Sequence, residues 1–182
     1  MRVVPDLIYL QSATFCAGIA AVTDLRSRRI PNWLTGSGFL LGLLLHFTLG
    51  GLRQTALALV SGVIAGGIFL LFCLAGGMGA GDMKLMAAVG CLAGVQSLSG
   101  ILLATALLGA LAAVLTTLFS GRLRETVANT CALLMHHGEH GLSAHPELNV
   151  RNASMLRLPY AIPIAGGCLA MLLVALREGA GL

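Results

Sequence analysis

The chain has 182 residues, of which 57% are hydrophobic and only 10% are charged, and its mean hydropathy is +0.92. Soluble domains carry roughly 25% charged residues, so this composition indicates an integral membrane protein and excludes a large soluble domain. The net charge of +4 comes from arginines between apolar runs, where basic residues set topology, so nucleic-acid binding is excluded as well.

Apolar runs predict an all-α, polytopic membrane protein with about six transmembrane helices. The runs cover residues 7–23, 33–50, 56–76, 85–119 and 158–176. As one helix, the run 85–119 would extend about 52 Å at 1.5 Å per residue, against a hydrocarbon core of about 30 Å. It must therefore fold back on itself, and we expect the turn at the polar, glycine-containing residues 96–100.

Glycines recur four residues apart inside the predicted helices. The pairs are Gly38 and Gly42, Gly62 and Gly66, and Gly90 and Gly94. Small residues at this spacing let membrane helices approach closely. We therefore expect a compact bundle in place of separate spans.

The basic residues predict how the helices are oriented. The first run is followed by more basic residues than precede it, which is typical of an uncleaved membrane helix and not of a signal peptide. The loops 24–32, 77–84 and 120–157 share one side and hold eight of the 11 lysines and arginines. Because cytoplasmic loops carry the excess of positive charge, we expect these loops inside the cell and both termini outside the cytoplasm.

We expect a single membrane-embedded domain over residues 1–182, with a cytoplasmic loop at 120–157 between the fifth and sixth helices. Residues 125–137 in that loop favour a helix lying at the membrane surface. Its histidines could in principle bind a metal, but solvated side chains are the simpler interpretation: His136, His137, His140 and His145. The five cysteines have no CxxC spacing, so neither a zinc site nor a disulfide framework is predicted.

Two of the seven acidic residues are candidates for chemistry, because ionisable groups at membrane depth are costly and tend to be functional. Asp24 ends the first helix, and alone it could be an interfacial aspartate paired with an arginine. Asp82 follows a run of glycines, and alone it could simply cap the start of a helix. They are 58 positions apart in the sequence, yet the predicted topology brings both to the cytoplasmic face.

Two converging carboxylates are typical of aspartic-peptidase chemistry, in which the pair shares one proton. The ionised member takes a proton from the attacking water, and the protonated member donates to the peptide carbonyl oxygen. Neither a metal nor an organic cofactor is needed. Helix dipoles favour negative charge at a helix start and disfavour it at a helix end, which makes Asp82 the base and Asp24 the acid.

The residues around both aspartates resemble the type IV prepilin peptidases, a family of GxGD membrane aspartic peptidases. Residues 79–85 read GAGDMKL and look like the family's GxGDxKL signature. Asp24 followed by RIPN at 29–32 looks like its first-aspartate motif. The closing LPYAIP at 158–163 is similar to members that serve Flp, or tight-adherence, pili.

This resemblance implies an enzyme of the bacterial cytoplasmic membrane that removes the short cytoplasmic leader from prepilins or pseudopilins. Asp24 and Asp82 would be catalytic, and Gly79, Gly81 and Lys84 would bind the substrate, with the glycines forming a bed for an extended chain. The sequence lacks the N-terminal region with paired CxxC motifs that longer members carry. The resemblance therefore implies the peptidase-only form, without N-methyltransferase activity.

Two other classes of protein remain open. A small transporter or proton-relay protein could use Asp24 and Asp82 to move protons or bind a cation, although neither residue is predicted near the middle of a span. A non-catalytic assembly factor of a pilus or secretion system is the other alternative. It would tolerate replacement of either aspartate by asparagine, whereas a peptidase would not.

Overall fold

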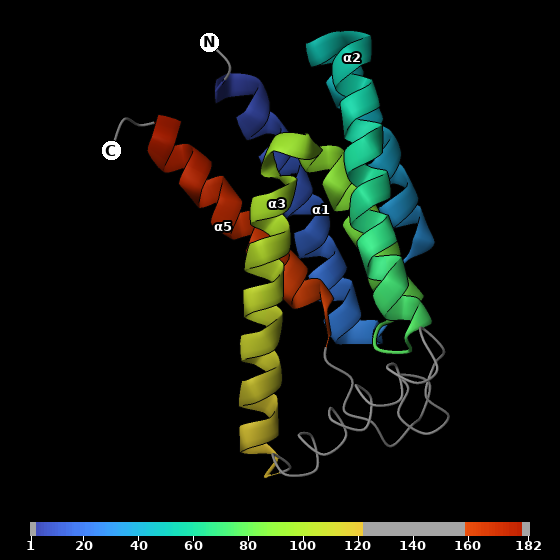
Figure 1. The fold of residues 1–182 in the computed structure, drawn as a ribbon, viewed down its shortest axis with the longest axis vertical. Coiled ribbons are helices and arrows are strands. Elements are labelled where there is room, and N and C mark those ends of the chain that lie inside the picture. The colour runs from blue at the N-terminus through green and yellow to red at the C-terminus, as the bar shows by residue number, and fades with distance from the viewer. Residues whose placement is uncertain (1–2, 122–158, 180–182) are drawn as a thin grey trace.

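The computed structural model describes residues 3–121 and 159–179. Within these ranges the chain forms helices and no strand (Figure 1). The helices are α1 (Val3–Ser27), α2 (Asn32–Leu74), α3 (Ala80–Phe119) and α5 (Ala161–Gly179). By length and composition, each of these 4 described helices could cross a membrane. Over the described residues the prediction of an all-α fold with helices suited to a membrane is confirmed, while the number of spans and the side of the termini stay predictions.

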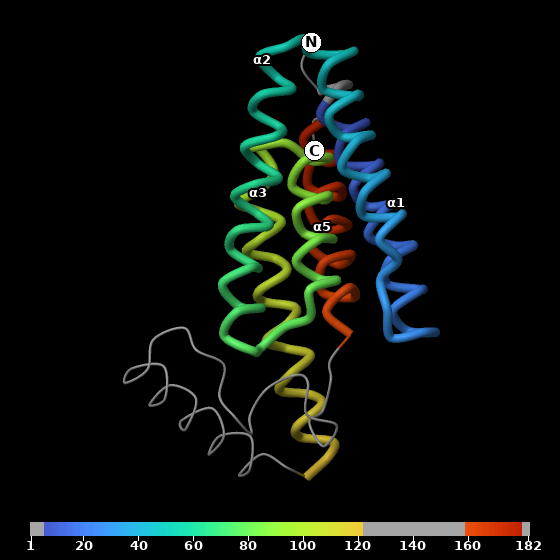
Figure 2. Tube along the Cα trace, turned by 90° about the vertical axis from the view of Figure 1, so that its right-hand side faces the viewer, coloured from blue at the N-terminus to red at the C-terminus, as the bar shows by residue number. Residues whose placement is uncertain are grey.

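Helix α2 reverses direction at Gly51, whose φ of 72° and ψ of −174° lie outside the helical region. Only glycine adopts such a conformation without steric cost. A straight helix of 43 residues would be roughly 65 Å long, much longer than a membrane is thick. The reversal divides it into two arms whose lengths are closer to that thickness. Figures 1 and 2 show the first arm (residues 32–50) rising and the second arm (residues 52–74) returning.

Helix α3 reverses in the same way at Gly94, with φ 75° and ψ 173°. The predicted turn at residues 96–100 is wrong, because those residues are helical. Polarity suggested that segment, but reversal needs a backbone conformation that glycine alone adopts readily. The first arm of α3 (residues 80–93) therefore ends earlier than predicted, and the second arm (residues 95–119) begins earlier.

The first arm of α3 packs tightly between the two arms of α2. A Cβ at Gly42 would lie 2.9 Å from the backbone of Cys91, and one at Gly90 would lie 2.9 Å from the carbonyl oxygen of Ser61. The Ser61 hydroxyl also donates a hydrogen bond of 2.7 Å to the carbonyl of Gly90. The expected close packing at the glycines is confirmed here, and it buries most of this arm.

Helix α5 packs antiparallel to the second arm of α3. A Cβ at Gly167 would lie 3.0 Å from the carbonyl oxygen of Ile101, while Gly109 faces Tyr160 and Pro163. Helix α1 lies against both α5 and α3. As a result, the end of α1 and the starts of α3 and α5 lie together at the end of the bundle opposite the N and C labels (Figure 1).

Candidate functional site

Asp24 lies in the last turn of α1 and is half-buried. The helix ends because Arg28 adopts a left-handed conformation (φ 51°), and the Arg28 N–H donates to the backbone carbonyl of Asp24 at 2.8 Å. Pro31, in an extended conformation, then precedes α2. This compact connection fixes Asp24 at the end of α1 and turns the chain directly into the first arm of α2.

Asp82 lies in the first turn of α3, after a loop in which Gly76 has a φ of 79°. Its backbone N–H donates to the Gly79 carbonyl at 3.2 Å, and the backbone N–H of Gly79 faces its carboxylate. A Cβ at Gly79 would lie 3.2 Å from Asp82 Oδ2. Asp82 is thus the third residue of the helix after the N-cap Gly79, and its side chain folds back over Gly79.

The two sequence segments that carry the aspartates contact each other. The Lys84 ammonium donates a hydrogen bond of 3.0 Å to Asn32 Oδ1, which joins the starts of α3 and α2. A Cβ at Gly81 would lie 3.4 Å from the side chain of Ile30, so Gly81 lets the connection after α1 approach α3. Lys84 and Gly81 were predicted to bind substrate, and in this structure Lys84 contacts Asn32 and Gly81 contacts Ile30.

Asp24 and Asp82 lie close enough for the charge of one to act on the other. The backbone N–H of Ala161 faces the Asp24 carboxylate, and Arg28 adds a positive charge nearby. Tyr160 lies within electrostatic reach of Asp82: burial, and then the negative charge of Asp82, raise the pKa of its phenol above the ordinary value of 10.0. Three segments distant in the sequence thus meet at one end of the bundle.

A family model described as the type IV leader peptidase family matches residues 12–114, a region that contains both Asp24 and Asp82. The chain belongs to this family. No curated protein and no solved structure matched it. Membership of the type IV leader peptidase family identifies a peptidase with a prepilin substrate in the membrane, and the apolar helices agree with an integral membrane protein.

The start of α5 lies outside the region matched by the type IV leader peptidase family, and sequence reasoning reached it only through the resemblance of residues 158–163. Backbone N–H groups at a helix start favour a nearby anion, and Ala161 supplies one to Asp24. The prediction that Asp82 is the base and Asp24 the acid depends on the dipoles of α1 and α3 alone. Since α5 adds a positive helix end at Asp24, helix dipoles no longer decide which of the two aspartates is the acid and which is the base.

Among residues 3–121 and 159–179, no cluster of three or more histidine, cysteine or acidic side chains could hold a metal ion. Four thiols in the same ranges are free: Cys16, Cys73, Cys91 and Cys168. The loop histidines, Cys131 and the surface helix predicted at 125–137 lie outside the described residues.

Proposed function

We propose that this leader peptidase is an aspartic endopeptidase that removes the short cytoplasmic leader from type IV prepilins or pseudopilins, with Asp24 and Asp82 as its catalytic pair. One observation carries the proposal. Two carboxylates separated by 58 positions come within electrostatic reach of each other in the region that matches the family. Their neighbours are backbone amides, an arginine and a tyrosine.

In the proposed reaction, the two carboxylates share one proton and act as a unit. The ionised carboxylate takes a proton from a water molecule as its oxygen attacks the scissile carbonyl carbon. The protonated carboxylate donates to the carbonyl oxygen, which gives a neutral tetrahedral intermediate. The carboxylate that holds the water proton then gives it to the leaving amine nitrogen, while the other carboxylate takes a proton from a hydroxyl of the intermediate. The C–N bond breaks, and the pair again holds one shared proton.

We also propose six membrane spans, formed by α1, the two arms of α2, the two arms of α3, and α5. The reversals at Gly51 and Gly94 support this count, and the start of α1 and the end of α5 lie at one end of the bundle (Figure 1). Basic residues after Asp24 and Lys84 beside Asp82 favour a cytoplasmic location for the pair. That location suits a substrate whose leader junction lies at the cytoplasmic membrane surface.

Three finer expectations stay proposals. Gly79 and Gly81 would support an extended substrate beside the pair, with Lys84 at the edge of this bed. A preference for Flp-like prepilins is supported only by the resemblance of residues 158–163. The absence of N-methyltransferase activity stays a prediction, which a methyl-transfer assay with S-adenosylmethionine would test on the purified protein.

Co-expression with a candidate prepilin tests the catalytic pair, with leader removal measured by mass spectrometry. We expect Asp24→Asn and Asp82→Asn each to lower the cleavage rate by roughly 10²-fold or more, since each removes an acid–base group. Asp6→Asn is the matched control, because Asp6 lies at the opposite end of α1. Cleavage that survives either of the first two substitutions would contradict the pair and favour an assembly factor or a transporter.

A further inference from the structure

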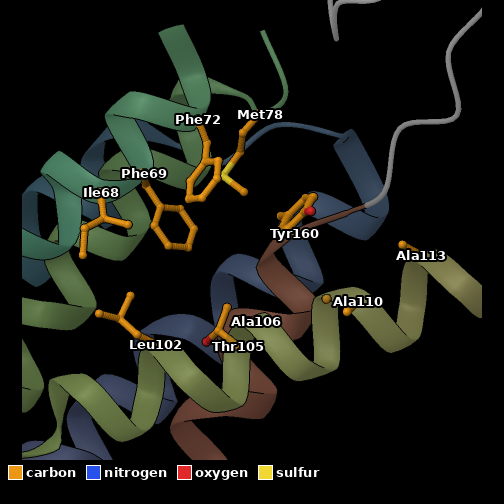
Figure 3. Close-up of a pocket in the computed structure, with 11 residues that line it drawn as sticks. Ile68, Phe69, Phe72, Met78, Leu102, Thr105, Ala106, Ala110, Ala113 and Tyr160 are labelled. Carbon is orange, nitrogen blue, oxygen red and sulfur yellow. The ribbon is translucent and has the colours of Figure 1, made fainter. Parts of the chain in front are cut away.

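A groove of about 490 Å³ lies between the second arm of α2 and the second arm of α3 (Figure 3). Ile68, Phe69 and Phe72 form one wall. The other wall is a face of α3, and Met78 and Tyr160 also line the groove. Among the described residues no charged side chain lines the groove, so the lining favours an apolar occupant.

The α3 wall has the shape that a second helix needs. Its members recur at steps of three and four along one helix face: Leu102, Thr105, Ala106, Gly109, Ala110 and Ala113. At 1.5 Å per residue this face is roughly 17 Å long, or about three helical turns. Most of these side chains are small, and small residues at such spacing let another helix approach closely within a membrane.

One polar side chain of the α3 wall, Thr105, is buried. Thr105 is 2% exposed, and its hydroxyl has no hydrogen-bond partner among the described residues. By contrast, the hydroxyls of Thr116 and Thr117 on the same helix both donate to the carbonyl four residues earlier. A Cβ at Gly167 of α5 would meet the Thr105 oxygen, so this hydroxyl faces α5 and adds no polar group to the groove.

Two residues that line the groove, Met78 and Tyr160, lie near the candidate catalytic pair. Met78 directly precedes the 79–85 segment in the sequence, and Tyr160 lies close enough to Asp82 for that carboxylate to raise its pKa. Figure 3 shows Met78 and Tyr160 facing the same space as Phe72. A helix lying in the groove would therefore have one end beside the two aspartates.

We propose that this groove binds the hydrophobic helix of the prepilin, the segment that directly follows the scissile bond. The assignment rests on the proposed function, because it identifies the occupant from the leader-cleavage reaction. The apolar lining holds the helix, the small residues of α3 set how closely it approaches, and Tyr160 marks where it ends. The polar leader then leaves the groove at the pair.

Substituting the α3 wall tests this proposal in the full-length protein with membrane-anchored prepilin. Ala106 faces the groove and is exposed, so Ala106→Leu fills the space without disturbing the core. We expect it to raise KM about tenfold with a much smaller change in kcat, because it removes binding and leaves the reacting groups in place. Ala112→Leu is the matched control, since Ala112 lies on the same helix but lines a neighbouring groove, which shares only Gly109 and Tyr160 with this one.

Photo-crosslinking gives a second readout that does not depend on turnover. p-Benzoylphenylalanine is introduced at position 110 or at position 112 of the Asp82→Asn protein, and crosslinks to prepilin are identified by mass spectrometry. We expect prepilin crosslinks from position 110 and not from 112. A KM within twofold of wild type for Ala106→Leu, or crosslinks only to lipid or only from position 112, would overturn the groove assignment. Wild-type protein that cleaves no prepilin would instead contradict the proposed function.

Discussion

The contact between Gly42 and the first arm of α3 leads to a quantitative prediction for Gly42→Ala. The added Cβ would lie 2.9 Å from the carbonyl carbon of Cys91 and 2.9 Å from the backbone nitrogen of Leu92. Both are backbone atoms of a buried helix, so neither can rotate away as a flexible side chain would. The first arm of α2 and the first arm of α3 must therefore separate, and Asp82 would shift because it lies on the first arm of α3.

The magnitude follows from two opposing effects. Overpacking a tight contact costs about 1–3 kcal/mol, whereas replacing glycine by alanine in a helix gains up to about 1 kcal/mol. We expect a net loss of about 1–2 kcal/mol, and for a chain of this size that corresponds to a Tm lower by about 2–8 °C. Prepilin cleavage should fall as well, because the positions of the reacting carboxylates change.

Thermal unfolding of the purified protein in detergent measures this effect, with Gly36→Ala as the matched control. Gly36 lies on the same arm of α2, and a Cβ there meets nothing within 4 Å. The control should keep or slightly raise the Tm, since only the helix-propensity gain applies. The reasoning is refuted if Gly42→Ala unfolds at or above the wild-type temperature while Gly36→Ala behaves as expected.

Three further predictions concern the ends of the helices. Lys84→Met and Asn32→Ala should have non-additive effects on the free energy of unfolding, with a coupling of about 0.5 kcal/mol or more in a double-mutant cycle. Additive effects would contradict the hydrogen bond between Lys84 and Asn32. Gly94→Ala should lower the Tm, because a left-handed conformation costs a residue with a Cβ about 1–2 kcal/mol; an unchanged Tm would contradict it. Tyr160 should titrate at lower pH in Asp82→Asn, measured by tyrosinate absorbance against Tyr160→Phe, since one cause of its raised pKa is removed. The folded state holds the Tyr160 proton more tightly than the unfolded state does. The stability that protonated Tyr160 contributes is therefore fully present below pH 10.0 and is lost as the pH rises through the raised pKa.

Hydropathy predicted the helical elements well, because apolar length is a property of the local sequence. The position of the α3 reversal was predicted wrongly, since polar residues at 96–100 were taken as the turn while the conformation of Gly94 decides it. A polar residue can lie within a helix, but a side chain at a left-handed position is strained. Gly94 was instead interpreted as a packing glycine. Glycines in the same apolar run therefore have two different roles, close helix packing and chain reversal.

The candidate site was predictable where its residues follow each other in the sequence, as they do around Asp24 and Asp82. The amide of Ala161 at the Asp24 carboxylate was not predictable, because every residue carries a backbone N–H and only tertiary structure selects this one. The same holds for the bond between Lys84 and Asn32. A lysine beside a proposed active site suggested substrate binding, and its partner lay 52 positions away.

The tight contacts at Gly42 and Gly90 also determine which parts of the molecule can move relative to each other. With backbone held against backbone on both sides, the first arm of α3 and the two arms of α2 behave as one rigid body, and Asp82 moves with it. Asp24 belongs to α1, outside this body. A change in the distance between the backbones of Asp24 and Asp82 therefore requires α1 to shift against the rigid body, with the hinge in the short connection from Arg28 to Pro31.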